Sequence, residues 1–154
     1  MKNTRPVQIL LVEDDEVDAE SMLRALRKLN LDNPLLHARD GCEALELLRA
    51  GENGEGVSDP YLIVLDINMP KMNGIEFLEA LRRDEEHKNA IVFVLTTSNA
   101  ARDKVQAYEY NIAGYLLKSN AGKGYTDVVG MLEQYWRFVE LPTRPNAHRD
   151  SLYV

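Results

Sequence analysis

Carboxylates that directly follow apolar segments are the residues with which this sequence could do chemistry. Glu13 and Asp14 come directly after the run QILLV, and Asp66 comes directly after LIVL. A buried carboxylate costs much free energy unless a cation or several hydrogen bonds compensate its charge. Carboxylates gathered at one place also repel one another, so we expect a positive group between them.

Two positive groups fit this requirement, a lysine and a divalent cation. Lys118 follows the run GYLL, and Thr96 follows the run IVFVL. Carboxylates together with a backbone carbonyl form an all-oxygen site, which suits Mg²⁺ or Mn²⁺ and disfavours zinc. The three histidines are scattered and lack the spacing of zinc ligands. A carboxylate beside Mg²⁺, a lysine and a hydroxyl can attack a phosphoryl group and hold it as an aspartyl phosphate.

The same residues also have ordinary explanations. The acidic cluster Glu13–Asp15 could cap the helix that follows it and complement its dipole. Thr96 could cap the next turn, and Lys118 could be a solvated loop residue. Asp66 is harder to explain in this way, because the strand before it should be the most buried one. The carboxyl ends of parallel strands meet at one edge of a sheet, where ligands bind, so together these side chains favour a site.

The alternation of short apolar runs with amphipathic segments predicts the elements that position these residues. Runs that are apolar on both faces are typical of strands in a parallel sheet covered by helices. We expect strands at Gln8–Val12, Leu62–Leu65, Ile91–Leu95 and Tyr115–Leu117, with Pro34–Ala38 as a weaker candidate. The order predicts an α/β fold with a doubly wound, five-stranded parallel sheet.

The helices are predicted from apolar residues at helical spacing and from capping residues. We expect the first helix after Asp15 or Glu16, where it carries Ala19, Met22, Leu23 and Leu26. The second should run from Asp40 to Gly51, and the third should start at about Gly74. The fourth should run from Ser98 or Asn99 to the turn Asn111–Gly114, and the last should carry Tyr125 to Val139 and end before Pro142.

Length and composition place limits on the function. The 154 residues predict one domain over residues 1–141, followed by a C-terminal arm or tail over residues 142–154. The net charge of −7 argues against nucleic acid as a partner. The single cysteine, Cys42, excludes an intrachain disulfide. We find neither a signal peptide nor a long apolar segment, so we expect a cytoplasmic protein without a membrane partner.

The motifs at the strand ends resemble those of the receiver domains of two-component response regulators. The resemblance rests on LLVEDD, LDINMPKMNG, VLTTS and GYLLKS in this order, and it covers roughly Val7 to Leu141. It implies a flavodoxin-like (βα)5 receiver fold. It also implies that Asp66 is the phosphoacceptor, that Asp14 binds Mg²⁺ directly, that Glu13 contributes through water, and that the main-chain carbonyl of Asn68 is a further ligand. Mn²⁺ is the alternative ion.

The resemblance assigns roles to three further residues. Thr96 would bind the phosphoryl group after transfer, Lys118 would pair with a phosphoryl oxygen, and Tyr115 would be the aromatic switch residue that moves with Thr96. The sequence departs from the family at Ser119, where a proline with a cis peptide bond usually follows the lysine. A cis bond without proline costs about 3 kcal/mol, so a trans bond is the less costly alternative.

We therefore expect a single-domain response regulator that receives a phosphoryl group from a sensor histidine kinase and does not act as an enzyme on a separate metabolite. The Lys118–Ser119 step, the long loop before Asp66 and the ending YWRFVELP look like stand-alone regulators of bacterial phytochrome kinases. Such proteins often form homodimers through the fourth helix, fifth strand and fifth helix, which also relay the signal. Aromatic residues gather in this part of the sequence, as at interfaces: Tyr108, Tyr110, Tyr125, Tyr135, Trp136 and Phe138.

Two other functions remain open. A Mg²⁺-dependent phosphatase with an aspartyl nucleophile would normally carry a second acid two residues after it, where this sequence has Asn68. A vestigial receiver that only dimerises is the other alternative, although every acidic and cationic element is retained.

Overall fold

A parallel sheet of five strands, in the order β2-β1-β3-β4-β5, lies at the centre of the molecule. The computed structural model describes residues 5–51 and 53–143. Its elements are β1 (Gln8–Val12), α1 (Glu16–Lys28), β2 (Leu35–Ala38), α2 (Gly41–Gly51), β3 (Tyr61–Leu65), α3 (Gly74–Arg83), β4 (Val92–Thr96), α4 (Ala101–Glu109), β5 (Gly114–Leu117) and α5 (Thr126–Phe138). The predicted doubly wound α/β sheet is confirmed, and each strand starts within one residue of its expected position.

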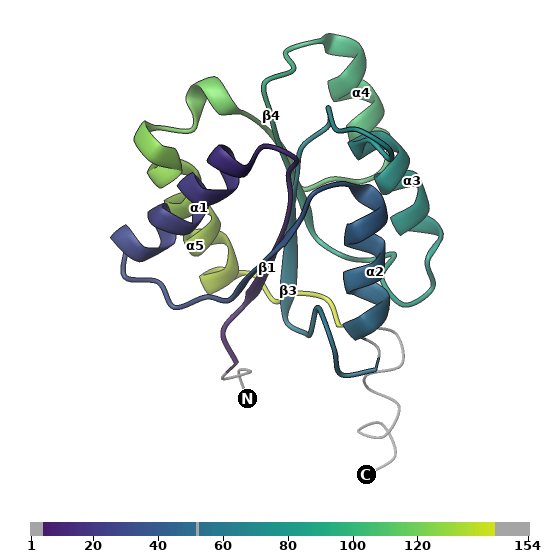
Figure 1. Cartoon of the computed structure of the whole chain (residues 1–154), viewed down its shortest axis with the longest axis horizontal. Coiled ribbons are helices and arrows are strands. Elements are labelled where there is room, and N and C mark those ends of the chain that lie inside the picture. Colours follow the sequence, from purple (N-terminus) through teal and green to yellow (C-terminus); the bar gives the residue numbers. More distant parts are fainter. Residues whose placement is uncertain (1–4, 52, 144–154) are drawn as a thin grey trace.

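Helices cover both faces of the sheet. Figure 1 shows α1 and α5 on one face and α2, α3 and α4 on the other. Successive residues of one strand point to opposite faces, so Leu10 belongs to the core under α2 and α3, whereas Ile9 and Leu11 belong to the core under α1 and α5. Because both faces are buried, the strands read as continuous apolar runs in the sequence.

Side-chain caps set the starts of α1 and α3. The Asp15 carboxylate accepts hydrogen bonds from the backbone N–H groups of Val17 and Asp18 and so begins α1. Asn73 and Glu76 form a reciprocal capping box at the start of α3. These bonds satisfy backbone donors that the first turn of a helix leaves without a partner. They also fix the residue at which α1 begins after β1 and the residue at which α3 begins after the loop that follows β3.

Some predicted helix boundaries were wrong. The fourth helix begins at Ala101, and the last helix begins at Thr126, because Tyr125 adopts a left-handed backbone conformation with φ of 65°. Two short 3-10 turns, Lys118–Asn120 and Lys123–Tyr125, fill the connection from β5 to α5. Within α1, Leu23 is only half-buried. Hydrophobic spacing alone therefore placed these boundaries imprecisely.

Gly74 lets α3 start directly against the segment that carries Asp66. A Cβ atom on Gly74 would lie 2.4 Å from the Asp66 carbonyl oxygen and 2.7 Å from the Ile67 Cα. Both of these are backbone atoms, so a side chain at this position would displace the chain next to Asp66. The backbone N–H of Gly74 also donates to the Ile67 carbonyl over 2.9 Å.

The strand order reverses between β1 and β3, and this point marks the expected ligand crevice. From β1 the chain crosses to β2 on one side and then returns to β3 on the other. In sheets of this kind ligands bind beyond the carboxyl ends of the strands at this switch point. Val12 and Leu65 are paired at the ends of β1 and β3, so the residues that follow them enter the same crevice.

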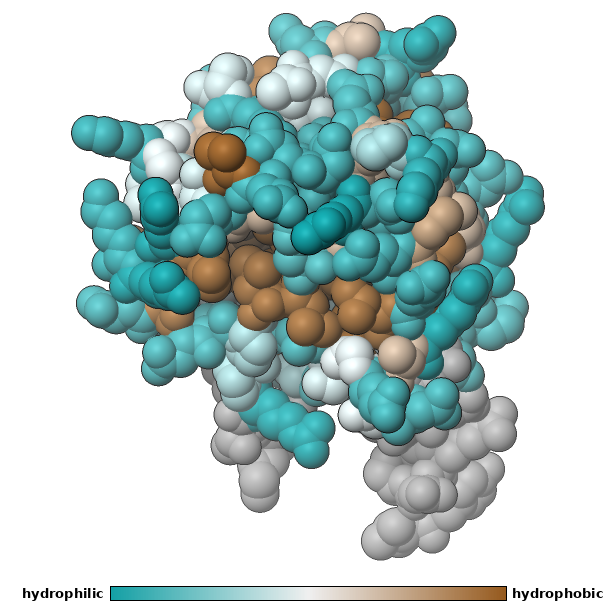
Figure 2. All heavy atoms as spheres, in the orientation of Figure 1, coloured by the Kyte–Doolittle hydropathy of each residue, from teal (hydrophilic) through white to brown (hydrophobic). Residues whose placement is uncertain are grey.

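The face of the molecule that Figure 2 shows is largely hydrophilic. Figure 2 shows apolar side chains gathered in a band across the middle of one face, between α1 and α2. Strand β2 forms one edge of the sheet, and Leu35–His37 are half-buried there. Within residues 5–51 and 53–143, no helix has the length and apolar character needed to cross a membrane. Residues 144–154 of the expected C-terminal arm lie outside the described residues, so the division at residue 141 stays a prediction.

Candidate functional site

Three carboxylates meet at the carboxyl ends of β1 and β3, as the sequence predicted. One carboxylate oxygen each from Glu13, Asp14 and Asp66 lies within 4.8 Å of the others. Glu13 and Asp66 are buried, with 3% and 6% of their surface exposed, whereas Asp14 is exposed. Such a cluster of oxygen atoms needs a positive charge beside it.

Lys118 supplies this charge from the end of β5. Its Nζ lies 2.7 Å from Glu13 Oε1, 3.1 Å from Asp66 Oδ2 and 2.6 Å from Asp18 Oδ2. The Lys118 side chain is only 10% exposed. An ammonium group has three N–H donors, so each of its donors can serve one of these carboxylates. The predicted lysine is therefore an integral part of the crevice.

Burial and charge pairing both shift the pKa values of the ionisable groups in the crevice. Burial acts to lower the pKa of Lys118, but the hydrogen bonds to Asp18 and Glu13 and the charge of Asp66 outweigh it, so the pKa is raised. Burial raises the pKa of Glu13 to about 8, although the hydrogen bond from Lys118 acts in the opposite direction. Lys118 thus stays charged near neutral pH, whereas burial shifts Glu13 towards its protonated form relative to an exposed glutamate.

Asp18 and the Tyr125 hydroxyl are parts of the crevice that the sequence did not predict. The Tyr125 hydroxyl donates to Asp18 Oδ1 over 2.9 Å, while Asp18 Oδ2 accepts from Lys118. Burial, and after it the hydrogen bond to Asp18, raise the pKa of Tyr125. One sequence signal was available for Asp18. It is an acidic residue four positions after Asp14, in the first turn of α1.

The other predicted residues lie around the carboxylates. The backbone N–H of Asn68 points to Asp66 Oδ1 over 3.4 Å, and the Asn68 side chain is exposed. Thr96 is fully buried at the end of β4. Among the described residues the cis peptide bond precedes Pro60, so the bond between Lys118 and Ser119 is trans. The ligand role of the Asn68 carbonyl stays a prediction.

Ser98 connects Thr96 with Tyr115. The backbone N–H of Ser98 donates to Thr96 Oγ1 over 3.3 Å, and the Ser98 carbonyl accepts from the Tyr115 hydroxyl over 2.9 Å. The Ser98 hydroxyl in turn binds the Asp103 carboxylate in the first turn of α4. Thr96, Tyr115 and the first turn of α4 are therefore connected through a single loop residue.

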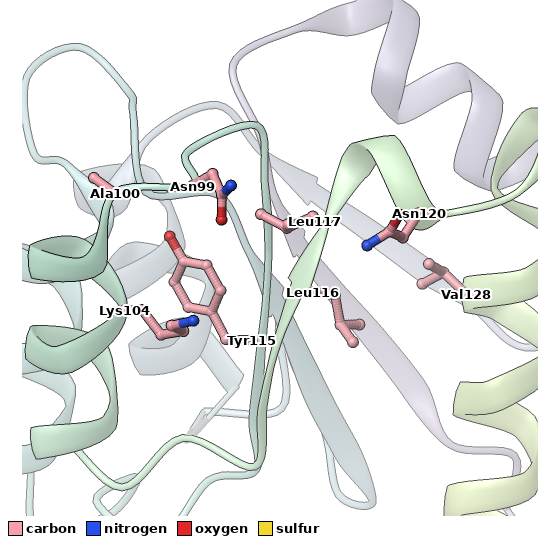
Figure 3. Close-up of a pocket in the computed structure, with 8 residues that line it drawn as sticks. All are labelled: Asn99, Ala100, Lys104, Tyr115, Leu116, Leu117, Asn120 and Val128. Carbon is pink, nitrogen blue, oxygen red and sulfur yellow. The ribbon is translucent and has the colours of Figure 1, made fainter.

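Tyr115 also lines a pocket of about 220 Å³ between α4 and α5. Figure 3 shows its ring beside Lys104 of α4 and its hydroxyl pointing towards the loop that contains Asn99. Leu116 and Val128 line the side of the pocket towards α5. The pocket is thus formed by the same elements that the sequence resemblance names as the output face.

Comparisons with known proteins identify the family of this chain. The response regulator receiver domain family matches residues 9–128. The response regulator Rcp1 of Synechocystis sp. (strain ATCC 27184 / PCC 6803 / Kazusa) is 35% identical over 142 residues, which cover 92% of this chain and 95% of that protein.

Two solved structures share the fold. The Mn²⁺-bound form of response regulator Rcp1 has a TM-score of 0.77 at 33% identity, covering 90% of this chain and 100% of that chain. The phosphorylated cyanobacterial phytochrome response regulator RcpA has a TM-score of 0.78 at 32% identity, with the same coverage of 90% and 100%. The predicted resemblance to phytochrome-associated regulators is thereby confirmed. With a family match that extends from β1 into α5, this chain belongs to the response regulator receiver family.

Proposed function

We propose that this protein is a two-component response regulator that is phosphorylated on Asp66. The observation that most supports this function is the Asp66 carboxylate itself, which is buried at a strand end with Oδ2 3.1 Å from Lys118 Nζ. Asp66 lies next to exposed Asp14 at the topological switch point, where ligands bind in sheets of this kind. Lys118 is already in place to bind the group that arrives.

The proposed reaction is a phosphoryl transfer to oxygen. An Asp66 carboxylate oxygen attacks the phosphorus atom, and the new O–P bond forms as the bond from phosphorus to the leaving group breaks. The leaving group is a histidine nitrogen of a sensor kinase, or acetate when acetyl phosphate is the donor. Lys118 donates a hydrogen bond to a phosphoryl oxygen and offsets its charge, and Thr96 binds the phosphoryl group after transfer.

A divalent cation fits the donor set of the crevice. Oxygen atoms of Glu13, Asp14 and Asp66 lie within 4.8 Å of one another, and such hard ligands suit Mg²⁺ or Mn²⁺. We propose that Asp14 and Asp66 bind the ion directly, that Glu13 acts through water, and that the Asn68 carbonyl is a further ligand. The Mn²⁺-bound form of the similar regulator Rcp1 supports a divalent cation as a ligand, and the choice of ligand residues is our proposal. When bound, the ion would offset charge on the transferred oxygens.

The signal would leave the site through the face formed by α4, β5 and α5. Phosphorylation draws Thr96 towards the phosphoryl group, and the hydrogen bonds of Ser98 transmit this change to Tyr115. Tyr115 then changes the pocket between α4 and α5. The proposed partner upstream is a sensor histidine kinase, and the likeness to RcpA supports a phytochrome as that kinase.

We also propose that the same face forms a homodimer. Tyr108 on α4 is 49% exposed, and Phe138 at the end of α5 is 78% exposed, so both are available to a partner. Other members of the predicted aromatic set are used inside the protein. Tyr135 packs edge-on against Phe93 with ring centroids 4.9 Å apart, and Trp136 packs partly on the same core. The interface that we propose therefore relies on fewer largely exposed aromatic residues than the sequence indicated.

Incubation of the protein with acetyl phosphate and Mg²⁺ is expected to add one phosphoryl group, which intact mass spectrometry detects as an acid-stable and base-labile adduct. Asp66→Asn should abolish the adduct because it removes the nucleophile. Asp32→Asn, which alters an exposed aspartate, should retain it. No adduct on the wild type would contradict the proposal, and continued release of phosphate from esters would favour the phosphatase instead.

Metal affinity is expected to rise with pH until it levels off near the pKa of Glu13, about 8. Below this value the metal-free protein carries a proton on Glu13 that must leave when the cation binds, so affinity should fall by about tenfold per pH unit. Calorimetric titration with Mn²⁺ across this range measures the effect, and Glu13→Gln should remove the pH dependence. Equal affinity at mildly acidic and mildly alkaline pH would be inconsistent with this role of Glu13.

Light scattering with and without beryllofluoride tests the dimer. We expect a dimer in the beryllofluoride-loaded protein, and Tyr108→Asp should weaken it by on the order of tenfold because a charge would be buried at the interface. Val17→Asp places the same charge on α1, where Val17 is 74% exposed, and should have no effect. A monomer under both conditions would rule out the dimer.

A further inference from the structure

We propose that Asp18 is a positioning residue, which holds the Lys118 ammonium group in place for phosphoryl transfer and is itself held by Tyr125. This inference rests on the proposed phosphorylation of Asp66. It adds to the site a residue of α1 and a residue from the segment before α5, neither of which would touch the phosphoryl group.

The contact between Asp18 and Lys118 is the shortest that the ammonium group makes. Lys118 Nζ lies 2.6 Å from Asp18 Oδ2, compared with 2.7 Å to Glu13 and 3.1 Å to Asp66. The Asp18 side chain is 25% exposed, so this ion pair is partly shielded from water. A shielded, short ion pair restricts a lysine side chain far more than an exposed one.

The other two partners of Lys118 would have further roles in the proposed site. Glu13 and Asp66 both belong to the cluster that can hold a divalent cation, and Asp66 would also carry the phosphoryl group. Asp18 lies outside that cluster. Its contact can therefore persist while the third donor of Lys118 passes from Asp66 Oδ2 to a phosphoryl oxygen. Without it, a flexible four-carbon side chain would have no fixed anchor in the loaded site.

Asp18 is held from both sides. Its Oδ1 accepts the Tyr125 hydroxyl over 2.9 Å while its Oδ2 accepts Lys118, so both carboxylate oxygens are engaged and rotation would break a bond. Tyr125 has a left-handed φ of 65°, which is rare for a bulky residue and aims its side chain from the start of α5 towards α1. Tyr125 therefore has a strained backbone conformation, and in this conformation its hydroxyl reaches Asp18.

A helix-capping role does not explain this arrangement. An acidic residue in the first turn of α1 would favour the helix dipole, but Glu16 supplies a second such charge and Asp15 already caps the helix. Glu16 pairs instead with Arg39, and both side chains are exposed. Glu16→Ala is therefore a matched control, because it removes a first-turn charge without touching Lys118.

The first experiment measures the rate of Asp66 phosphorylation by acetyl phosphate at saturating Mg²⁺. Asp18→Ala should slow it by on the order of tenfold, as expected when a catalytic group loses its position. Tyr125→Phe should slow it by a smaller factor, and Glu16→Ala should match the wild type. A normal rate in Asp18→Ala would overturn the positioning role while leaving the proposed function intact. A wild type without any adduct would instead refute the proposed function.

A double-mutant cycle separates positioning from a general structural effect. If Asp18 acts through Lys118, then Asp18→Ala should cause no further loss of rate in the Lys118→Met background. Equal losses in both backgrounds would overturn the inference. As a readout that does not depend on activity, acylation of Lys118 by an amine-reactive ester should be several times faster in Asp18→Ala than in the wild type and in Glu16→Ala. Unchanged acylation would show that Asp18 does not restrain the lysine.

Discussion

The charge balance between one lysine and three carboxylates is the interaction on which the rest of this structure depends. Lys118 extends from the end of β5 to Glu13 after β1, to Asp66 after β3 and to Asp18 in α1, with all three N–O distances between 2.6 and 3.1 Å. Carboxylates buried next to one another without a cation would each cost several kcal/mol. The carboxyl edge of the sheet can therefore carry a reactive aspartate because Lys118 neutralises it, and a divalent cation would complete the same task during phosphoryl transfer.

The surrounding structure keeps these charges in place and connects them to the surface. Gly74 allows α3 to begin against the backbone of Asp66, and Asp15 fixes the start of the helix that carries Asp18. On the other side, Ser98 joins buried Thr96 to half-exposed Tyr115 through two hydrogen bonds. Two sets of hydrogen bonds thus lead outwards, one from Thr96 at the end of β4 to Tyr115 and one from Lys118 through Asp18 to the start of α5. Both lead towards the proposed output face.

Much of this could be predicted from the sequence. Strands buried on both faces are continuous apolar runs, and a parallel sheet brings the residues after those runs to one edge, which is how Glu13, Asp66 and Lys118 were found together. Asp18 was missed because its partner lies 100 residues further along the chain, so the contact depends on how α1 packs against the segment before α5. Periodicity also could not separate Tyr135, which packs on Phe93, from exposed Phe138, since both lie at helical spacing on α5.

The free energy of unfolding of Lys118→Met, measured by denaturant titration at mildly alkaline pH with and without Mn²⁺, tests the charge balance most directly. Removing the Lys118 ammonium group should leave the carboxylates without compensation and reduce the free energy of unfolding of the metal-free protein by about 3 kcal/mol. Because Mn²⁺ can replace the missing charge, it should stabilise the variant more than the wild type. A variant as stable as the wild type without metal, or a loss that Mn²⁺ does not reduce, would contradict this account.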